Sequence, residues 1–288
     1  MKRLALAFTL GAALVAGAAQ AQSPANWSAP GEPLQIGKNL YYVGTEGIAA
    51  FLITTPEGHI LIDGAMPTSA PLIEASIRKV GFDPKDVKVL LNTHAHFDHA
   101  AGLAQLKADT GATMVASAGD KPALEGGTYI GSEEVAAFDF APVKVDRVIG
   151  DGESVELGGV ALTAHLTPGH SPGCTTWTFP VEIAGKARQA VLYCSTSVAA
   201  NRLVSKDKGP QYPGIVDDYR ASFAKLGQMK ADVFLAPHAE QFGLAEKRER
   251  LAAGDAEAFV DPTELPAVVA ASRAAFETAL KRQEEAAR

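Results

Sequence analysis

Short apolar runs alternate with turn residues in the N-terminal half of the chain. Residues 40–55 hold two such runs with glycines between them, and residues 59–65 hold a third after the turn at 56–58. Apolar runs separated by Gly and Pro indicate strands joined by hairpins. The continuous apolar run at 87–93 is also of strand length, and it is typical of a strand buried on both faces.

The segment after these strands has apolar residues at the spacing of a helix. Leu72, Ile73, Ile77 and Val80 repeat at the interval of a helix, and Gly81 suits its C-terminal end. Residues 118–142 lack strong periodicity, which predicts a long surface loop of the kind that often borders a site. Further helices are predicted at about 100–107, at 215–226 and from about Leu265, and further strands at 112–117, 145–167, 174–181, 189–197 and 232–237. With no linker, repeat or low-complexity tract to divide it, the chain is predicted to form one layered α/β domain.

The first 21 residues differ from the rest. Two basic residues precede an apolar centre, and Ala19-Gln20-Ala21 follows, which is the order of a secretory signal peptide. A short membrane anchor is the alternative, but the apolar centre is shorter than the roughly 20 residues that span a bilayer. We therefore expect a signal peptide at 1–21, a domain at 22–288, and export to the periplasm as a soluble protein with no membrane association after cleavage.

Charge and cysteine content narrow the function classes. Removing residues 1–21 takes away two of the 26 basic residues and none of the 33 acidic ones, so the net charge changes from −7 to −9. An acidic chain without basic runs argues against nucleic acid or anionic membrane as a partner. Cys174 and Cys194 are too few for a disulfide framework. We expect structural thiols, and a disulfide between them remains open.

Five of the seven histidines follow predicted strands. His94 and His96 alternate after the apolar run at 87–93, so they can point to one side. Asp98 and His99 come where the chain turns into a helix. His170 lies in "TPGHSPG" and His238 in "APHAE", each after another strand.

Imidazole and carboxylate are natural ligands for zinc. A single His-x-His would usually be surface or capping residues, but the combined pattern predicts a metal site. His59 and His165 match no pattern and are expected to be structural.

The segments "THAHFDH", "TPGHSPGCTTW" and "LAPHA" resemble the metallo-β-lactamase superfamily over nearly all of residues 22–288, and "LLNTHAHFDHAAGLAQL", "GHSPGCTTWTF" and "YPGIVDDYRASFAKL" look most like subclass B3 metallo-β-lactamases. The resemblance implies an α/β fold, the four-layer αββα sandwich, with the metal site at one edge. It implies two Zn²⁺ ions per chain. The first would be held by His94, His96 and His170, and the second by Asp98, His99 and His238.

The resemblance also bears on the strand end at 189–197. The preferred register places Ser195 where B3 relatives have a serine that approaches the second metal through water, and Ser197 where they bind the substrate carboxylate. Subclass B1 enzymes have a cysteine ligand there, so ligation by Cys194 is the alternative. Thioesterases resembling glyoxalase II and many lactonases have a metal-bridging aspartate in this segment. "VLYCSTSVA" has none, and the nearest acid downstream is Asp207.

The chemistry implied is hydrolysis of the β-lactam amide in penicillins, cephalosporins and carbapenems, with antibiotic resistance as the result. Two metals can activate a shared water at neutral pH, and Asp98 would be the catalytic residue that orients it. The alternatives are an exported lactonase or thioesterase of the same fold, or a zinc-binding protein without catalysis. Three protein ligands per metal leave open positions, which favours catalysis over binding alone. A monomer that acts on a small-molecule antibiotic is expected.

Overall fold

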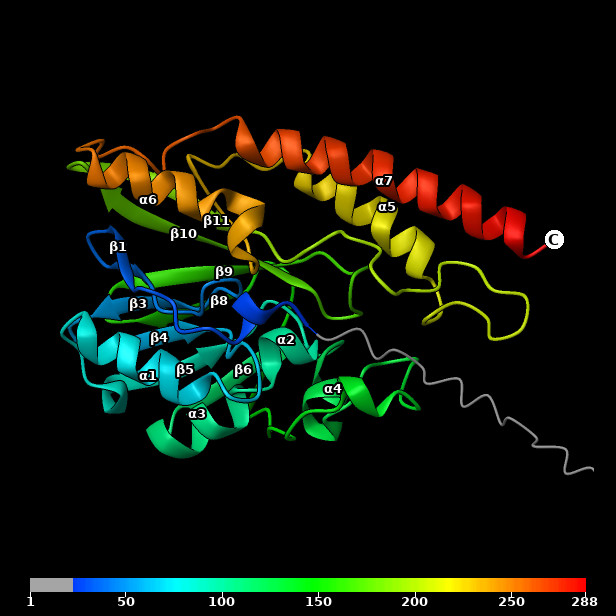
Figure 1. Cartoon of the computed structure of the whole chain (residues 1–288), viewed down its shortest axis with the longest axis horizontal. Helices are drawn as coiled ribbons and strands as arrows, with labels where there is room; N and C mark the ends of the chain where they lie inside the picture. Colours follow the sequence, from blue (N-terminus) through cyan, green and yellow to red (C-terminus); the bar gives the residue numbers. More distant parts are fainter. Residues whose placement is uncertain (1–22) are drawn as a thin grey trace, which may run out of the picture.

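The structure is a computed structural model that describes residues 23–288, so the predicted signal peptide at 1–21 lies outside the described residues. Two sheets lie face to face, with helices on both outer sides (Figure 1). This arrangement confirms the predicted αββα sandwich. Within residues 23–288, no helix has the length and apolar character needed to cross a bilayer.

The first sheet has seven strands in sequence order. Its first four strands pair antiparallel, and the later ones pair parallel, which places the carboxyl ends of β4, β5 and β6 at one edge. The strands are β1 (Leu34–Gly37), β2 (Leu40–Tyr42), β3 (Phe51–Thr55), β4 (Gly58–Ile62), β5 (Val87–Leu91), β6 (Thr113–Ser117) and β7 (Arg147–Ile149).

The second sheet has five strands in the order β12-β11-β10-β9-β8. Strands β8 to β11 pair antiparallel, and β12 pairs parallel to β11. The strands are β8 (Ser154–Leu157), β9 (Val160–Leu166), β10 (Thr175–Ile183), β11 (Lys186–Leu192) and β12 (Val233–Leu235).

Helices α1 and α3 cover the first sheet, and α5, α6 and α7 cover the second (Figure 1). The α-helices are α1 (Ala70–Lys79), α2 (Phe97–Ala100), α3 (Leu103–Thr110), α4 (Lys121–Gly126), α5 (Ile215–Leu226), α6 (Leu244–Ala252) and α7 (Glu264–Ala286). Short 3₁₀ turns occur at Ala25–Trp27, Pro84–Asp86, Ala136–Phe138 and Ala239–Phe242. The sequence pattern missed β1, α4 and α6, and the segment predicted as a long loop contains α4.

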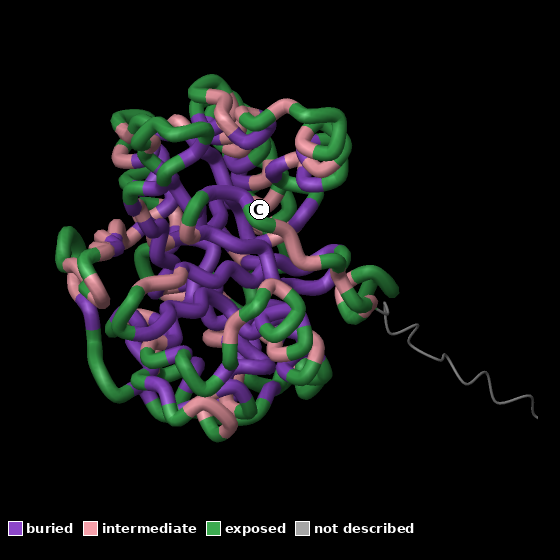
Figure 2. The backbone as a smooth tube through the Cα atoms, turned by 90° about the vertical axis from the view of Figure 1, so that its left-hand side faces the viewer, coloured by how far each residue is buried: buried purple, intermediate pink, exposed green. Residues whose placement is uncertain are grey.

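Two apolar cores, one on each face of the first sheet, explain why its strands are continuous apolar runs. Phe51 and Ile53 of β3 face the core between the sheets, whereas Leu52 between them faces the core beneath α1 and α3. Leu90 and Leu91 of β5 divide in the same way, so the carboxyl end of this strand is buried on both faces as predicted. Buried segments run through the interior, and exposed segments form the outer loops (Figure 2).

Candidate metal centre

The predicted ligands meet at the edge where the sandwich presents its strand ends. His94 and His96 follow β5, and His96 is the N-cap residue of α2. Asp98 and His99 therefore lie within the single turn of that four-residue helix. His170 lies in the connection from β9 to β10, and His238 follows β12. The structure brings all six side chains into two adjoining groups of three.

The first group is His94, His96 and His170, and all three side chains are buried. Their ring centroids are 4.6 Å apart for His94 and His96, 4.6 Å for His94 and His170, and 4.4 Å for His96 and His170. One ligand atom from each ring lies within 4.8 Å of the other two. Three nitrogens at this spacing can point at one metal ion.

The second group is Asp98, His99 and His238. Oδ2 of Asp98 lies 3.2 Å from Nε2 of His99 and 3.5 Å from Nε2 of His238. The two Nε2 atoms are 3.2 Å apart. The ring of His99 also lies 4.3 Å, centroid to centroid, from the ring of His94. The two groups therefore adjoin, as a site for two neighbouring metals requires.

Hydrogen bonds at Nδ1 determine the tautomers of His94 and His170. The Thr93 hydroxyl donates to Asp63 at 2.8 Å, so it accepts from Nδ1 of His94 at 3.1 Å. Nδ1 of His170 lies 2.8 Å from the Ser197 carbonyl oxygen, which can only accept. With the proton on Nδ1, each ring keeps the lone pair of Nε2 for a metal. Nε2 of His94 is buried without a partner among the described residues, which fits a metal ligand.

Charge in the site also fits cation binding. Burial lowers the pKa of His170 to about 4, and burial together with the nearby His99 lowers the pKa of His238 to about 3. These rings are therefore neutral at pH 7, the form that binds metal. Burial alone would raise the pKa of Asp98, but the charge and hydrogen bond of His99 together with the nearby His96 and His238 lower it by more, so the carboxyl group is ionised. Burial alone would lower the pKa of His99, but the charge and hydrogen bond of Asp98 together with the charges of Asp63 and Glu240 raise it, and a metal would compete with that proton.

Asn201 holds the loop that carries His170. Its side-chain amide donates to the carbonyl oxygens of His170 at 2.9 Å and Gly169 at 3.3 Å. Its side-chain oxygen accepts from the Tyr129 hydroxyl at 2.8 Å. The Tyr219 hydroxyl donates to the Ser197 carbonyl at 2.8 Å, the same oxygen that accepts from His170. Sequence reasoning missed Asn201 because nothing near it in the chain indicates this contact.

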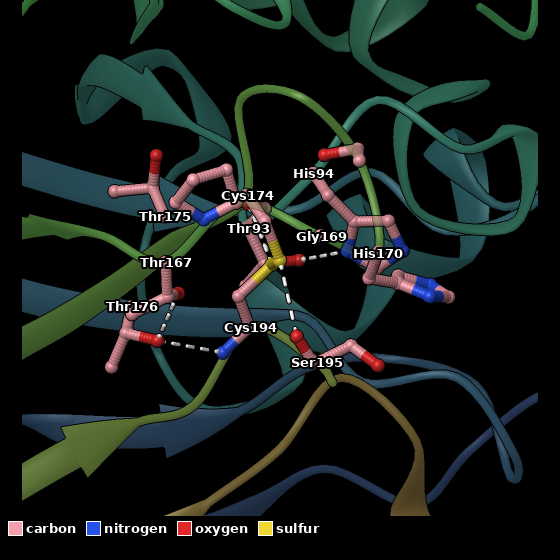
Figure 3. The surroundings of a disulfide bond; sticks show 12 residues. Thr93, His94, Thr167, Gly169, His170, Cys174, Thr175, Thr176, Cys194 and Ser195 are labelled. Atoms are coloured by element: carbon pink, nitrogen blue, oxygen red, sulfur yellow. Dashed lines mark hydrogen bonds between the residues drawn. A yellow bond between two sulfur atoms is a disulfide. The ribbon is translucent and has the colours of Figure 1, made fainter. Parts of the chain in front are cut away.

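Cys174 and Cys194 form a disulfide beside the first group, with 5.8 Å between their Cα atoms (Figure 3). The disulfide that the sequence left open is therefore formed, and the expectation that both residues are thiols was wrong. It failed because the pairing of β10 with β11, which brings the two cysteines together, cannot be read from two isolated residues. With its sulfur bonded to Cys174, Cys194 has no thiolate to offer a metal. Ser195 instead lies at the site, where it and Ser197 line the cleft above the two groups.

The cleft has a volume of about 270 Å³, near the lower end of small-molecule sites, which are roughly 300–1,000 Å³. Apolar and aromatic side chains surround the metal-binding groups. The ring of Trp27 lies 5.1 Å from that of His238, and Tyr129 stacks on His96 at 4.2 Å. No lysine or arginine is among the described residues that line the cleft, which are Trp27, His94, His96, Phe97, Asp98, Tyr129, Phe138, His170, Ser195, Ser197, Ala199, Ala200, His238 and Gln241.

His59 and His165, the two histidines that match no motif, lie outside the two groups of possible ligands. His59 of β4 packs edge-on against Phe82, which lies in the segment after α1, and His165 pairs with the Thr178 hydroxyl across β9 and β10. Asp207, the nearest acid after the strand end at 189–197, borders a separate surface pocket beside Gln283.

Comparison with known proteins agrees with this geometry. A family model described as the metallo-β-lactamase superfamily matches residues 43–182. The crystal structure of BJP-1, a subclass B3 metallo-β-lactamase of Bradyrhizobium japonicum, is 47% identical with a TM-score of 0.88, and the alignment covers 92% of this chain and 99% of that one. The chain belongs to the metallo-β-lactamase superfamily. The native metallo-β-lactamase FEZ-1 of Legionella gormanii is 43% identical with a TM-score of 0.85, covering 89% and 98% of the two chains.

Curated relatives of this superfamily member have other activities. The hydroxyacylglutathione hydrolase of Rhodospirillum rubrum is 26% identical over 169 residues, which are 59% of this chain and 53% of that protein. The N-acyl homoserine lactonase of Bacillus thuringiensis is 28% identical over 158 residues, covering 47% and 59%. The chain thus spans just over half the length of these relatives. Family membership establishes a metal-dependent hydrolase fold, and the likeness to subclass B3 predicted from the sequence is confirmed.

Proposed function

We propose that this protein is a β-lactamase that binds two zinc ions and hydrolyses penicillins, cephalosporins and carbapenems. The observation that carries the proposal is the pair of adjoining donor sets, His94, His96 and His170 beside Asp98, His99 and His238. Support comes from subclass B3 enzymes that align over nearly their whole length. Residues 193–199, which follow β11, also contain Ser195 and Ser197 and no aspartate, whereas the family resemblance implies a metal-bridging aspartate in this segment of thioesterases and lactonases.

The six donors would hold two ions that, when bound, activate a water molecule and polarise the lactam carbonyl. Asp98 is an ionised acceptor at the junction of the two groups, so its carboxylate can orient the attacking water. The proton on Nδ1 of His170 is held by the Ser197 carbonyl, which keeps that ring in one orientation. These residues therefore preorganise the site before substrate arrives.

Substrate recognition would come from the two serines and the aromatic walls. The Ser197 hydroxyl can donate to the carboxylate next to the lactam nitrogen, because Ser197 lines the cleft. No basic side chain is among the described lining residues, so none is available there to pair with that carboxylate. Trp27, Phe97 and Phe138 offer apolar surface to the substrate's side groups. Monobactams carry a sulfonate bonded directly to the lactam nitrogen, a bulkier anion near the second donor group. We therefore expect broad hydrolysis with monobactams as poor substrates.

The deciding experiment compares purified, zinc-loaded protein on a penicillin, a carbapenem, a monobactam, a lactone and a thioester at equal concentration. Efficient carbapenem turnover that a chelator abolishes and zinc restores supports the proposal. Brisk lactone or thioester cleavage with no β-lactam turnover would replace it with the activity of the curated relatives. Elemental analysis at saturating zinc should find about two ions per chain, and one ion in fully active protein would contradict the dinuclear site.

Export to the periplasm and a monomeric state belong to the same proposal. N-terminal sequencing of protein from the periplasmic fraction should begin at Gln22, directly after Ala21. Retention of residues 1–21 in a membrane fraction would favour the anchor. Light scattering should give a mass below the 30.0 kDa of the full chain, and twice that mass would reject the monomer.

A further inference from the structure

Asp120 lies outside the proposed ligands, at the turn between β6 and α4. Its side chain is fully buried, with no exposed surface. It occupies the N-cap position of α4, where an aspartate usually accepts from the first backbone N–H groups of the helix. Here the side chain makes no such capping bond. The carboxylate is directed instead toward the two loops that carry His94, His96 and His170.

Four donors surround this carboxylate. Oδ2 accepts from the backbone N–H of Ala95 at 2.8 Å and lies 3.2 Å from the Ser171 hydroxyl and 3.5 Å from the Asn92 amide. Oδ1 accepts from the backbone N–H of Gly173 at 2.9 Å. Ala95 stands between His94 and His96, and Ser171 adjoins His170. One carboxylate therefore joins both loops that supply the first donor group.

The close approach of these segments depends on two glycines. A Cβ atom on Gly119 would lie 2.4 Å from the Pro172 carbonyl oxygen, and one on Gly173 would lie 2.2 Å from the backbone nitrogen of Asp120. The Ser117 hydroxyl also donates to the Gly173 carbonyl at 2.7 Å. The β6–α4 turn is thus packed backbone to backbone against the His170 loop, and Asp120 fills the junction.

We propose that Asp120 is a positioning residue that sets the spacing of His94, His96 and His170 and so determines metal affinity at this group. None of its four donors is a member of the second group or adjacent to one along the chain. Removing the Asp120 carboxylate should therefore weaken metal binding at the first group and leave binding at the second group largely unchanged. Outer partners of metal ligands typically change affinity by roughly 10–100-fold when mutated. The inference rests on the proposed metal-binding role of the histidines, but it is independent of the choice of substrate.

Asp120→Asn is the sharpest test. Asparagine has one oxygen and one NH₂ group, whereas the backbone N–H groups of Ala95 and Gly173 point at different oxygens of Asp120. Either orientation of the amide places a donor against a donor. The volume of the side chain is unchanged, so the substitution alters the hydrogen bonding without opening a cavity.

Affinity for zinc alone is measured by competition with a chromophoric chelator in three backgrounds. His238→Ala and His99→Ala each remove a ligand of the second group and leave the first group, His94, His96 and His170, intact. His96→Ala leaves the second group intact. Adding Asp120→Asn should weaken zinc binding at least tenfold in the His238→Ala and His99→Ala backgrounds and less than threefold in the His96→Ala background.

Asp232→Asn is the matched control, because Asp232 also accepts from a backbone N–H, that of Gln189, but precedes β12 at the end opposite the site. It should change zinc affinity less than threefold in every background. Equal weakening of both groups by Asp120→Asn, or no weakening, would overturn the inference. If that variant does not fold, Ser171→Ala decides by the same comparison, with at least a threefold selective loss expected. Failure of the parent proteins to bind zinc would instead refute the proposed function, and the inference with it.

Discussion

Removing the disulfide between Cys174 and Cys194 should lower the free energy of unfolding by about 3 kcal/mol. The two cysteines are 20 residues apart, and a cross-link that closes a loop of about this length restricts the unfolded chain by roughly that amount. For a domain of this size each 1 kcal/mol corresponds to about 2–4 °C in melting temperature. The expected decrease is therefore on the order of 6–12 °C.

Zinc-free protein is the proper sample, because bound metal adds its own stabilisation to the folded state. Guanidinium unfolding can be followed through tryptophan fluorescence, because Trp177 is fully buried in the core between the sheets and becomes exposed on unfolding. Oxidised wild type, reduced wild type and the double variant Cys174→Ala/Cys194→Ala are compared. Reduced protein isolates the cross-link, since its side chains are otherwise unchanged.

A difference of less than about 1 kcal/mol between oxidised and reduced wild type would refute the entropic argument. Zinc content gives a second readout. Because neither cysteine belongs to the two donor groups, Cys194→Ser should keep two zinc ions. Loss of one ion in that variant would make Cys194 a ligand and move the protein toward the subclass B1 pattern.

Three further predictions concern the site and its supports. Asp98→Asn should fold but lose at least about 100-fold in kcat, because the attacking water loses its orienting acceptor; near wild-type turnover at full zinc content would remove Asp98 from the mechanism. Trp27→Ala should raise KM a few-fold with unchanged zinc stoichiometry, since its ring lines the cleft, and an unchanged KM would exclude substrate contact. Gly173→Ala should lower the free energy of unfolding by about 1–3 kcal/mol through overpacking. Gly227→Ala, whose nearest atom would lie 3.2 Å away, is the control and should change it by about 1 kcal/mol or less.

The sequence was sufficient to predict the donor residues, because each follows a recognisable strand and histidine is scarce elsewhere. His94, His96, Asp98 and His99 form one local motif, and the apolar run before it marks β5 directly. The layered fold could likewise be predicted from short apolar runs separated by turn residues, such as the run that forms β3. Helix α4 was missed because its six residues include Pro122 and Gly126, and Gly127 follows as the C-cap, which leaves little helical periodicity to detect.

The residues that hold the ligand-bearing loops in place could not be predicted from the sequence in the same way. Asp63, Asp120 and Asn201 are ordinary polar residues in the sequence, and their roles depend on which loops the two sheets bring together. The disulfide depends on the register of β10 with β11, where Trp177 pairs with Leu192 and so places Cys174 near Cys194. Such contacts join segments 20 to 80 residues apart, and no local pattern records them.

The two donor groups differ in how their distant histidine is held. Each combines residues of the 94–99 segment with one histidine from far along the chain. His170 is held by side chains, through the contacts of Asp120 and Asn201 with its loop. His238 is held mainly by backbone pairing: it bridges to Ile48, and the flanking residues Pro237 and Ala239 bond to Ala49 and Gly47. Point substitutions should therefore weaken the first group more readily, because a side-chain contact can be deleted and a backbone contact cannot.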